Sequence, residues 1–128
     1  MINYIRSFFI MKEVFDGKLD SLGKDYSLIP IAVATSVESV DAKTVAILHD
    51  VVVETDFDFE ELFFLEENVL EALDVLIIKD DEEYLSYIER LKENELAREV
   101  KLAVLKNRIK ELKKLKLNHV NTPAIKPD

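Results

Sequence analysis

The sequence predicts an all-α fold, a bundle of about six or seven helices around one core. Nearly half of its 128 residues are apolar (48%), and along most of the chain they recur at helical spacing. Only two glycines and three prolines interrupt them, which argues against a loop-rich β protein. The length suits one domain, which we place at residues 1–118, followed by a flexible tail at residues 119–128.

The first part of the chain predicts three helices and one long loop. Residues 2–15 are apolar at helical spacing. Residues 16–27 contain both glycines and predict a loop, and a loop of this length in a compact domain is often functional. Pro30 suits the first turn of a short buried helix. Asp41 is the expected N-cap of the next helix, although residues 51–53 taken alone would also suit a strand.

Cap signals divide the following part of the chain. Asp58 with Glu61 three residues later resembles a capping box, and Asp80 with Glu83 repeats that pattern. Between these two signals, residues 68–78 are apolar at positions i, i+3, i+4 and i+7. We therefore expect one helix after each cap and an amphipathic helix between them.

A long basic helix is predicted to end the domain. Asn94 can cap it, and it should run from residue 95 to about residue 117. The net charge of the chain is −9, yet residues 101–116 carry seven basic side chains and Glu111 as their one acid. Two solvated helix faces of opposite charge explain this asymmetry. The alternative is a homo-oligomer, in which the acidic middle of one copy contacts the basic helix of another. Because the acidic remainder would repel phosphate, we expect no DNA or RNA partner.

Composition also constrains the compartment. The chain has no cysteine, so it can form neither a disulfide nor a thiol nucleophile. Its longest apolar runs fall far short of the roughly 20 residues that span a bilayer. Its start has no small-residue cleavage signature. These observations predict a cytoplasmic protein without a membrane partner.

One dipeptide raises the question of a metal site. His49 and Asp50 stand side by side in AILHDVVVETDFDFEEL, residues 46–62. Neighbouring side chains on a helix diverge by about 100°, so the pair can hold a metal only if donors arrive from other segments. Taken alone, the dipeptide favours a satisfied core or surface histidine.

Longer motifs change that weighting. FDGKLDSLGKDYSLIP (15–30) follows the spacing AHxGQxDKxGxPYxxHP and keeps its glycines and its tyrosine, Tyr26. VAILHDVVVETDFDFEEL (45–62) follows VAxLHDVVEDTDxTxEDL, and residues 69–105 follow VLEALxLLTxxxxxxYxxYIxRIxxNPLARxVKLADL. These patterns belong to the HD-domain metal-dependent phosphohydrolases, and the chain resembles their RelA/SpoT-like branch, which removes pyrophosphate from the stringent-response nucleotide guanosine tetraphosphate.

The resemblance implies an HD-domain-like helical bundle and a metal site with four ligands. His49 and Asp50 match two of them. The other two positions hold Ile29, where the family has the histidine of its HP motif, and Val104, where it has the aspartate of KLAD. Because aliphatic side chains have no lone pair to donate, we predict a degenerate metal centre without a cofactor.

The resemblance also suggests residues for catalysis and for substrate binding. Glu54 matches one carboxylate of the acidic pair that follows the HD motif, and it is the candidate catalytic residue. Lys18, Lys24, Arg98 and Lys101 are candidate phosphate contacts, although ordinary solvated cations would explain them equally well.

We therefore predict a pseudoenzyme that binds a guanine nucleotide or a protein partner without cleaving it. The alternative is an active phosphohydrolase of guanosine tetraphosphate or a related nucleotide that uses His49, Asp50 and Glu54 with Mn²⁺ or another divalent ion. That alternative needs further ligands, such as His119 from the predicted tail.

Overall fold

The structure, a computed structural model, describes residues 1–121, and it describes side chains through residue 117. Within residues 1–121 the chain forms six α-helices and one 3-10 helix, and no β-strand. The elements are α1 (Ile2–Val14), α2 (Leu28–Thr35), α3 (Val40–Glu54), η1 (Phe59–Leu62), α4 (Glu67–Leu76), α5 (Tyr84–Lys92) and α6 (Glu95–Asn121). The predicted all-α fold is confirmed.

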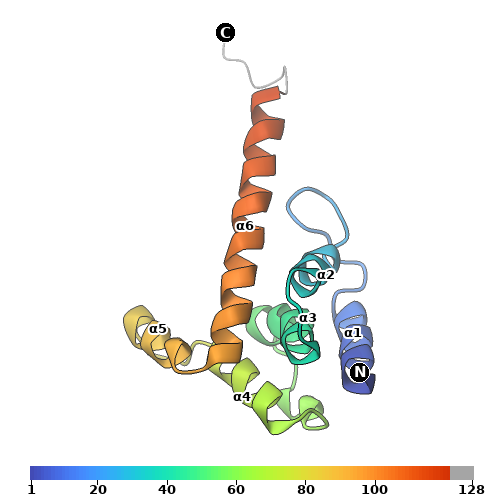
Figure 1. Ribbon diagram of the computed structural model, residues 1–128. Helices are drawn as coiled ribbons and strands as arrows, with labels where there is room; N and C mark the ends of the chain where they lie inside the picture. The colour runs from blue at the N-terminus through green and yellow to red at the C-terminus, as the bar shows by residue number, and fades with distance from the viewer. Residues whose placement is uncertain (122–128) are drawn as a thin grey trace.

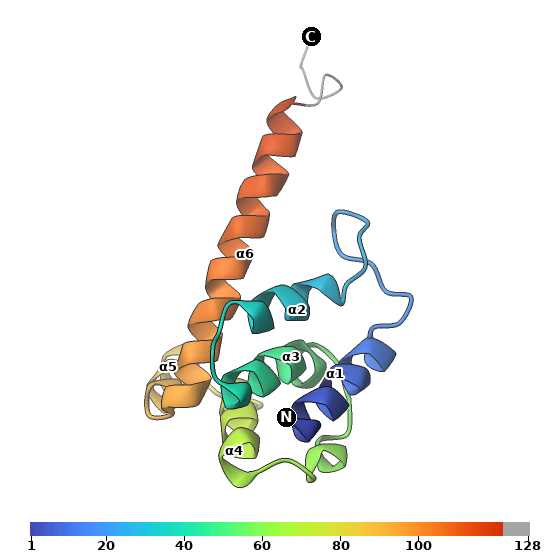
Figure 2. The ribbon, with the colours of Figure 1, turned by 45° about the vertical axis from the view of Figure 1, so that its right-hand side comes forward.

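The central element is α3. It packs against α1, α2, α4 and the first half of α6, as Figures 1 and 2 show. Apart from Lys43, every side chain from Ala42 to Val52 is buried. The suggested strand at residues 51–53 does not form, because the helical period of the apolar residues places this turn in the core.

The start of α3 differs from the prediction. Its N-cap is Ser39, whose side chain accepts a hydrogen bond from the Ala42 amide at 3.0 Å. The predicted cap, Asp41, lies inside the first turn and is wrong as a cap. The reason is local, because Ser39 has the extended backbone that a capping residue requires and Asp41 is already helical.

The two predicted capping boxes have different outcomes. Asp58 does cap a helix, since its side chain accepts a hydrogen bond from the Glu60 amide at 3.0 Å, but that helix is the four-residue η1. Asp80 is wrong as a cap, because α5 begins at Tyr84 and Glu83 is its N-cap residue, without a side-chain cap bond.

Arg90 of α5 holds the connection between α4 and α5. Its guanidinium donates to both carboxylate oxygens of Glu82, at 3.0 and 2.8 Å, and to the backbone carbonyls of Val75 and Ile77, at 3.1 and 3.0 Å. Carbonyls at the end of a helix need such donors. Glu82 also accepts a hydrogen bond from the Lys79 amide at 3.0 Å, so this connection is organised around Glu82 and not around Asp80.

Helix α6 is longer than predicted. Asn94 caps it as expected, accepting a hydrogen bond from the Ala97 amide at 2.9 Å, and the helix continues to Asn121. Its second half extends well beyond the bundle (Figure 1). Residues 119–121 are therefore helical and not part of a tail, whereas residues 122–128 of the predicted tail lie outside the described residues. Among residues 1–121, no helix has both the length and the apolar character needed to cross a bilayer.

Candidate functional site

The long loop between α1 and α2 has a defined shape. Oδ1 of Asp20 accepts hydrogen bonds from the backbone amides of Leu22 and Lys24, at 2.8 and 2.9 Å. Gly23 completes this turn with a φ of 80°, a left-handed conformation that side chains rarely adopt. The loop returns to the bundle at Tyr26, whose ring lies 4.5 Å from the ring of Phe15, centroid to centroid.

At the inner end of this loop lies a buried polar cluster. The side chains of His49 and Asp50 are joined by a contact of 2.7 Å between Nδ1 and Oδ1. The Tyr26 hydroxyl donates to the other carboxylate oxygen, Oδ2, at 2.9 Å. Only 2% of His49 and 7% of Asp50 are exposed. The Asp50 carboxylate therefore joins the loop, through Tyr26, to the central helix α3.

The environment of Asp50 favours its ionised form. Burial raises the pKa of this carboxyl, but its interactions with His49, the hydrogen bond from Tyr26 and the nearby Arg108 cation together hold the pKa below its usual value. Burial and the neighbouring Asp50 carboxylate raise the pKa of the Tyr26 hydroxyl, so Tyr26 remains a donor. An ionised carboxylate has no proton to give, so Nδ1 of His49 carries the hydrogen of their shared bond.

The other ring nitrogen of His49 has a different environment. Nε2 is buried, and no hydrogen-bond partner for it exists within the described residues. In the neutral ring the bond from Nδ1 to Asp50 leaves the lone pair on Nε2. The prediction of a satisfied histidine therefore holds for Nδ1, whereas Nε2 lacks a hydrogen-bond partner among the described residues.

A cavity of about 130 Å³ adjoins this histidine. Ile29 of α2 and Val104 of α6 line it together with His49 and Asp50 of α3. The four positions that the resemblance assigns to metal ligands thus surround one cavity. Glu54, Asn107 and Arg108 also line it.

The donors needed for a metal ion are incomplete. No three side chains of His, Cys, Asp or Glu are close enough to share an ion in the part of the chain that the structure describes. Ile29 and Val104 contribute only aliphatic carbon, and each oxygen of Asp50 already accepts a bond from another side chain. A zinc or manganese site uses three or more protein donors, so this donor set does not fit a resident metal.

A wider, open cleft of about 670 Å³ lies on the other side of Tyr26. Tyr26 and Glu54 line both the cleft and the cavity. Lys18 is the one cation among the side chains that line the cleft, and the carboxylates of Glu54 and Asp56 lie there as well. With one cation and two carboxylates, the cleft has no positive potential that would attract a polyphosphate.

The other predicted phosphate contacts lie elsewhere. Lys24 lines a separate depression near the outer half of α6. Arg98 donates to the backbone carbonyl of Lys92 at 3.0 Å. The Lys101 ammonium lies 5.9 Å from the ring centre of Tyr87, and burial lowers its pKa. The four cations therefore do not converge, and the side chain of His119 lies outside the described residues.

Comparison with protein-family models and with curated protein sequences finds no match. The resemblance to the HD-domain family therefore remains a prediction from the sequence motifs.

Sequence reasoning missed the tie between Tyr26 and Asp50. The signal was present, because Tyr26 is one of the few polar residues of segment 15–30 that match the motif it resembles. A tyrosine in a loop does not reveal its acceptor, however, and 24 positions separate the two residues.

Proposed function

We propose that this protein is a degenerate HD-domain phosphohydrolase homologue of the RelA/SpoT-like branch that works as a binding module without a metal centre. One observation carries the proposal: the four positions of the family's metal ligands line a single cavity, and two of them are Ile29 and Val104. Such an arrangement is expected if the helices of the family are retained while half of the coordinating groups are replaced.

The free energy of folding explains how the helical bundle could be retained after the metal site and its activity were lost. Removing one buried leucine from a packed core costs about 2–5 kcal/mol. A buried polar group adds little stability and costs free energy when it lacks a partner. Exchanging two ligands for aliphatic side chains therefore preserves the bundle and removes catalysis.

The charges around the cleft favour a protein over a nucleotide as the ligand of this binding module. A polyphosphate needs several converging cations. The cleft offers Lys18 beside Glu54 and Asp56, and the remaining candidate cations lie apart from it. We therefore place protein recognition ahead of nucleotide recognition.

Metal content is the direct test. The protein is purified without chelator and analysed for transition metals, and pyrophosphate release from guanosine tetraphosphate is measured with added Mn²⁺. We expect substoichiometric metal and no turnover. One metal per chain together with turnover that His49→Ala abolishes would establish the active enzyme and overturn the proposal.

A second measurement separates the two kinds of ligand. Guanine nucleotides at millimolar concentration are expected to leave the unfolding temperature unchanged, since a ligand that binds the native state must raise it. A rise that Lys18→Ala removes, with Lys24→Ala as the matched control from the same loop, would favour the nucleotide over the protein partner.

A further inference from the structure

Four large apolar side chains form an exposed stripe along the middle of α6, from its last core contacts outward. They are Leu102, Leu105, Ile109 and Leu112, and their exposed fractions are 52%, 38%, 53% and 59%. Their spacing of three, four and three residues is that of the a and d positions of a coiled coil. We call this set the α6 stripe.

The α6 stripe is not a continuation of the core. The core contact of α6 is made by Ala97, Val100 and Val104, all buried. Residues two apart on a helix differ in direction by about 200°, so Leu102 lies nearly opposite Val104. From Leu102 to Leu112 the stripe covers about 15 Å, or about three turns, and its side chains are exposed among the residues that the structure describes.

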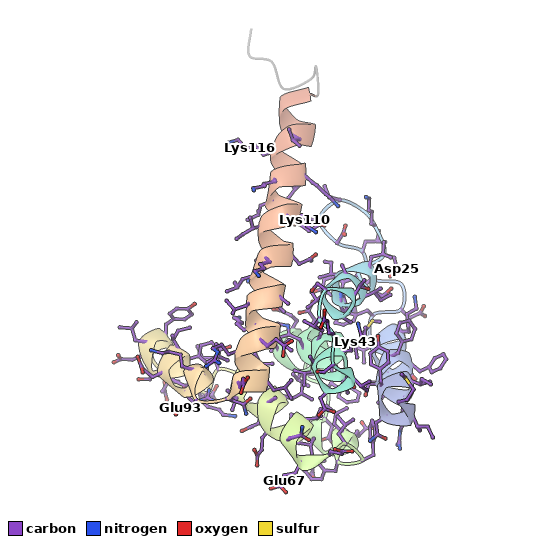
Figure 3. All side chains as sticks on the ribbon, in the orientation of Figure 1. Asp25, Lys43, Glu67, Glu93, Lys110 and Lys116 are labelled. Atoms are coloured by element: carbon purple, nitrogen blue, oxygen red, sulfur yellow. The ribbon has the colours of Figure 1, made fainter. Side chains whose placement is uncertain are left out.

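The charges beside the α6 stripe have one sign. With Leu102 as an a position, the flanking e and g positions of these turns are occupied by Lys101, Lys106, Arg108 and Lys113. Figure 3 shows two further cations, Lys110 and Lys116, on the projecting half of α6, far from the acidic Glu67 and Glu93. Flanking e and g charges set partner choice in helix pairs.

This pattern disfavours a second copy as the occupant. Two α6 stripes laid against each other would bring cations opposite cations in either direction, which is unfavourable. The acidic helix of the same chain is α4, which carries Glu67, Glu71 and Asp74 and is only ten residues long. Its apolar side chains Val69, Leu73 and Leu76 are buried in the core, so α4 offers no exposed stripe to a second copy.

We propose that the α6 stripe binds an acidic amphipathic helix of another protein, with leucine-like residues in its seam and glutamate or aspartate beside them. The inference rests on the proposed function, because it supplies the partner of a binding module. Apolar burial would provide affinity, and the opposed charges would select the partner and its register.

A designed peptide tests the chemistry directly. The probe is a fluorescent peptide of about four heptads with leucine at a and d and glutamate at e and g. Its matched control has lysine at e and g. Both are titrated with the full chain, with anisotropy as the readout, at about 0.05 M and about 0.5 M NaCl.

We expect the glutamate peptide to bind, at least tenfold more tightly at low salt, and the lysine peptide not to bind. Ile109→Asp with Leu112→Asp should weaken binding at least tenfold. Phe9→Asp on α1, an equally exposed apolar residue at 65%, is the control and should bind like the parent chain. Circular dichroism checks that each variant stays helical.

A charge swap keeps the proposal falsifiable if the double aspartate variant unfolds. Lys106→Glu with Lys113→Glu should shift the preference toward the lysine peptide. Equal binding of both peptides to the parent chain, or no binding of the glutamate peptide, would overturn the inference. The inference would also be overturned if sedimentation equilibrium showed that the parent chain is a homodimer and that the Ile109→Asp variant is a monomer. None of these results depends on metal or turnover, so the proposed function is judged separately.

Discussion

The Tyr26 hydroxyl lies 2.9 Å from Oδ2 of Asp50 and donates a hydrogen bond to it. Tyr26 ends the long loop and Asp50 lies in the central helix α3, so this bond fixes the loop to the most buried element of the fold. Tyr26 also lines both the small cavity and the open cleft.

Replacing Tyr26 with phenylalanine should destabilise the protein by about 1–3 kcal/mol, because a buried ionised acceptor loses a donor. Urea unfolding at neutral pH measures the change. Tyr4→Phe is the matched control, since the structure gives its hydroxyl no side-chain bond among the described residues, and it should change stability by less than about 0.5 kcal/mol. Equal effects of the two substitutions would contradict the role of the Tyr26 bond.

Restoring the two missing ligands should create metal binding. Ile29→His together with Val104→Asp brings four donors to the cavity that His49 already lines. We expect about one Mn²⁺ per chain and an unfolding temperature that rises with Mn²⁺ concentration. Isothermal calorimetry and thermal unfolding measure this.

The single variants Ile29→His and Val104→Asp are the controls for that restoration and should bind Mn²⁺ at least tenfold more weakly. Failure of the double variant with its fold intact would mean that these positions are not the family's ligand positions. The proposed function, which depends on this correspondence, would then be overturned.

The start of α3 provides a test of helix capping. Ser39→Ala removes the acceptor for the Ala42 amide and should cost about 0.5–2 kcal/mol. Asp41→Ala is the comparison, because Asp41 lies in the first turn and interacts only with the helix dipole and with Asn68 at the surface. It should cost a few tenths of a kcal/mol. The reverse order in thermal unfolding would restore Asp41 as the cap.

The ion pair of Arg90 and Glu82 predicts a pH dependence. The hydrogen bonds from Arg90, and a further one from the Lys79 amide, lower the pKa of Glu82 from 4.5 to about 2. A carboxyl whose pKa is lower in the folded state stabilises the protein above its unfolded pKa, and this contribution disappears as the pH falls through the folded value.

Glu82→Gln removes that titration. The unfolding temperatures of the parent chain and of this variant should differ by a constant amount above about pH 5.5, and the difference should narrow between about pH 4.5 and pH 2. Glu89→Gln, an exposed carboxyl with a longer ion pair of 3.7 Å to Lys92, is the control and should show little difference at any pH. A difference for Glu82→Gln that does not change with pH would refute the ionic role.

Local signals predicted the helices well and their ends less well. The apolar period of residues 40–54 is enough to predict a buried helix, because every turn repeats it. The choice between Ser39 and Asp41 as a cap depends on the backbone conformation of the preceding residues, which composition does not reveal. Asp80 failed for a different reason, since Arg90, a residue of the next helix, determines the conformation of this connection.

For the candidate site, sequence motifs identified which positions belong together but not how they bond. Ile29, His49, Asp50 and Val104 come from three helices and line one cavity. The bond between Asp50 and Tyr26 and the unpaired Nε2 of His49 result from side-chain directions within the packed bundle. The scattered positions of Lys24, Arg98 and Lys101 have the same origin.

Helix α6 combines two environments in one continuous element. Its early turns are anchored by the buried side chains of Val100 and Val104, whereas most side chains described beyond residue 111 are exposed. An isolated helical segment of that length is only marginally stable. Amide hydrogen exchange should therefore accelerate steadily toward the end of α6, so a slowing confined to these turns would report engagement of a binding partner without any label on either molecule.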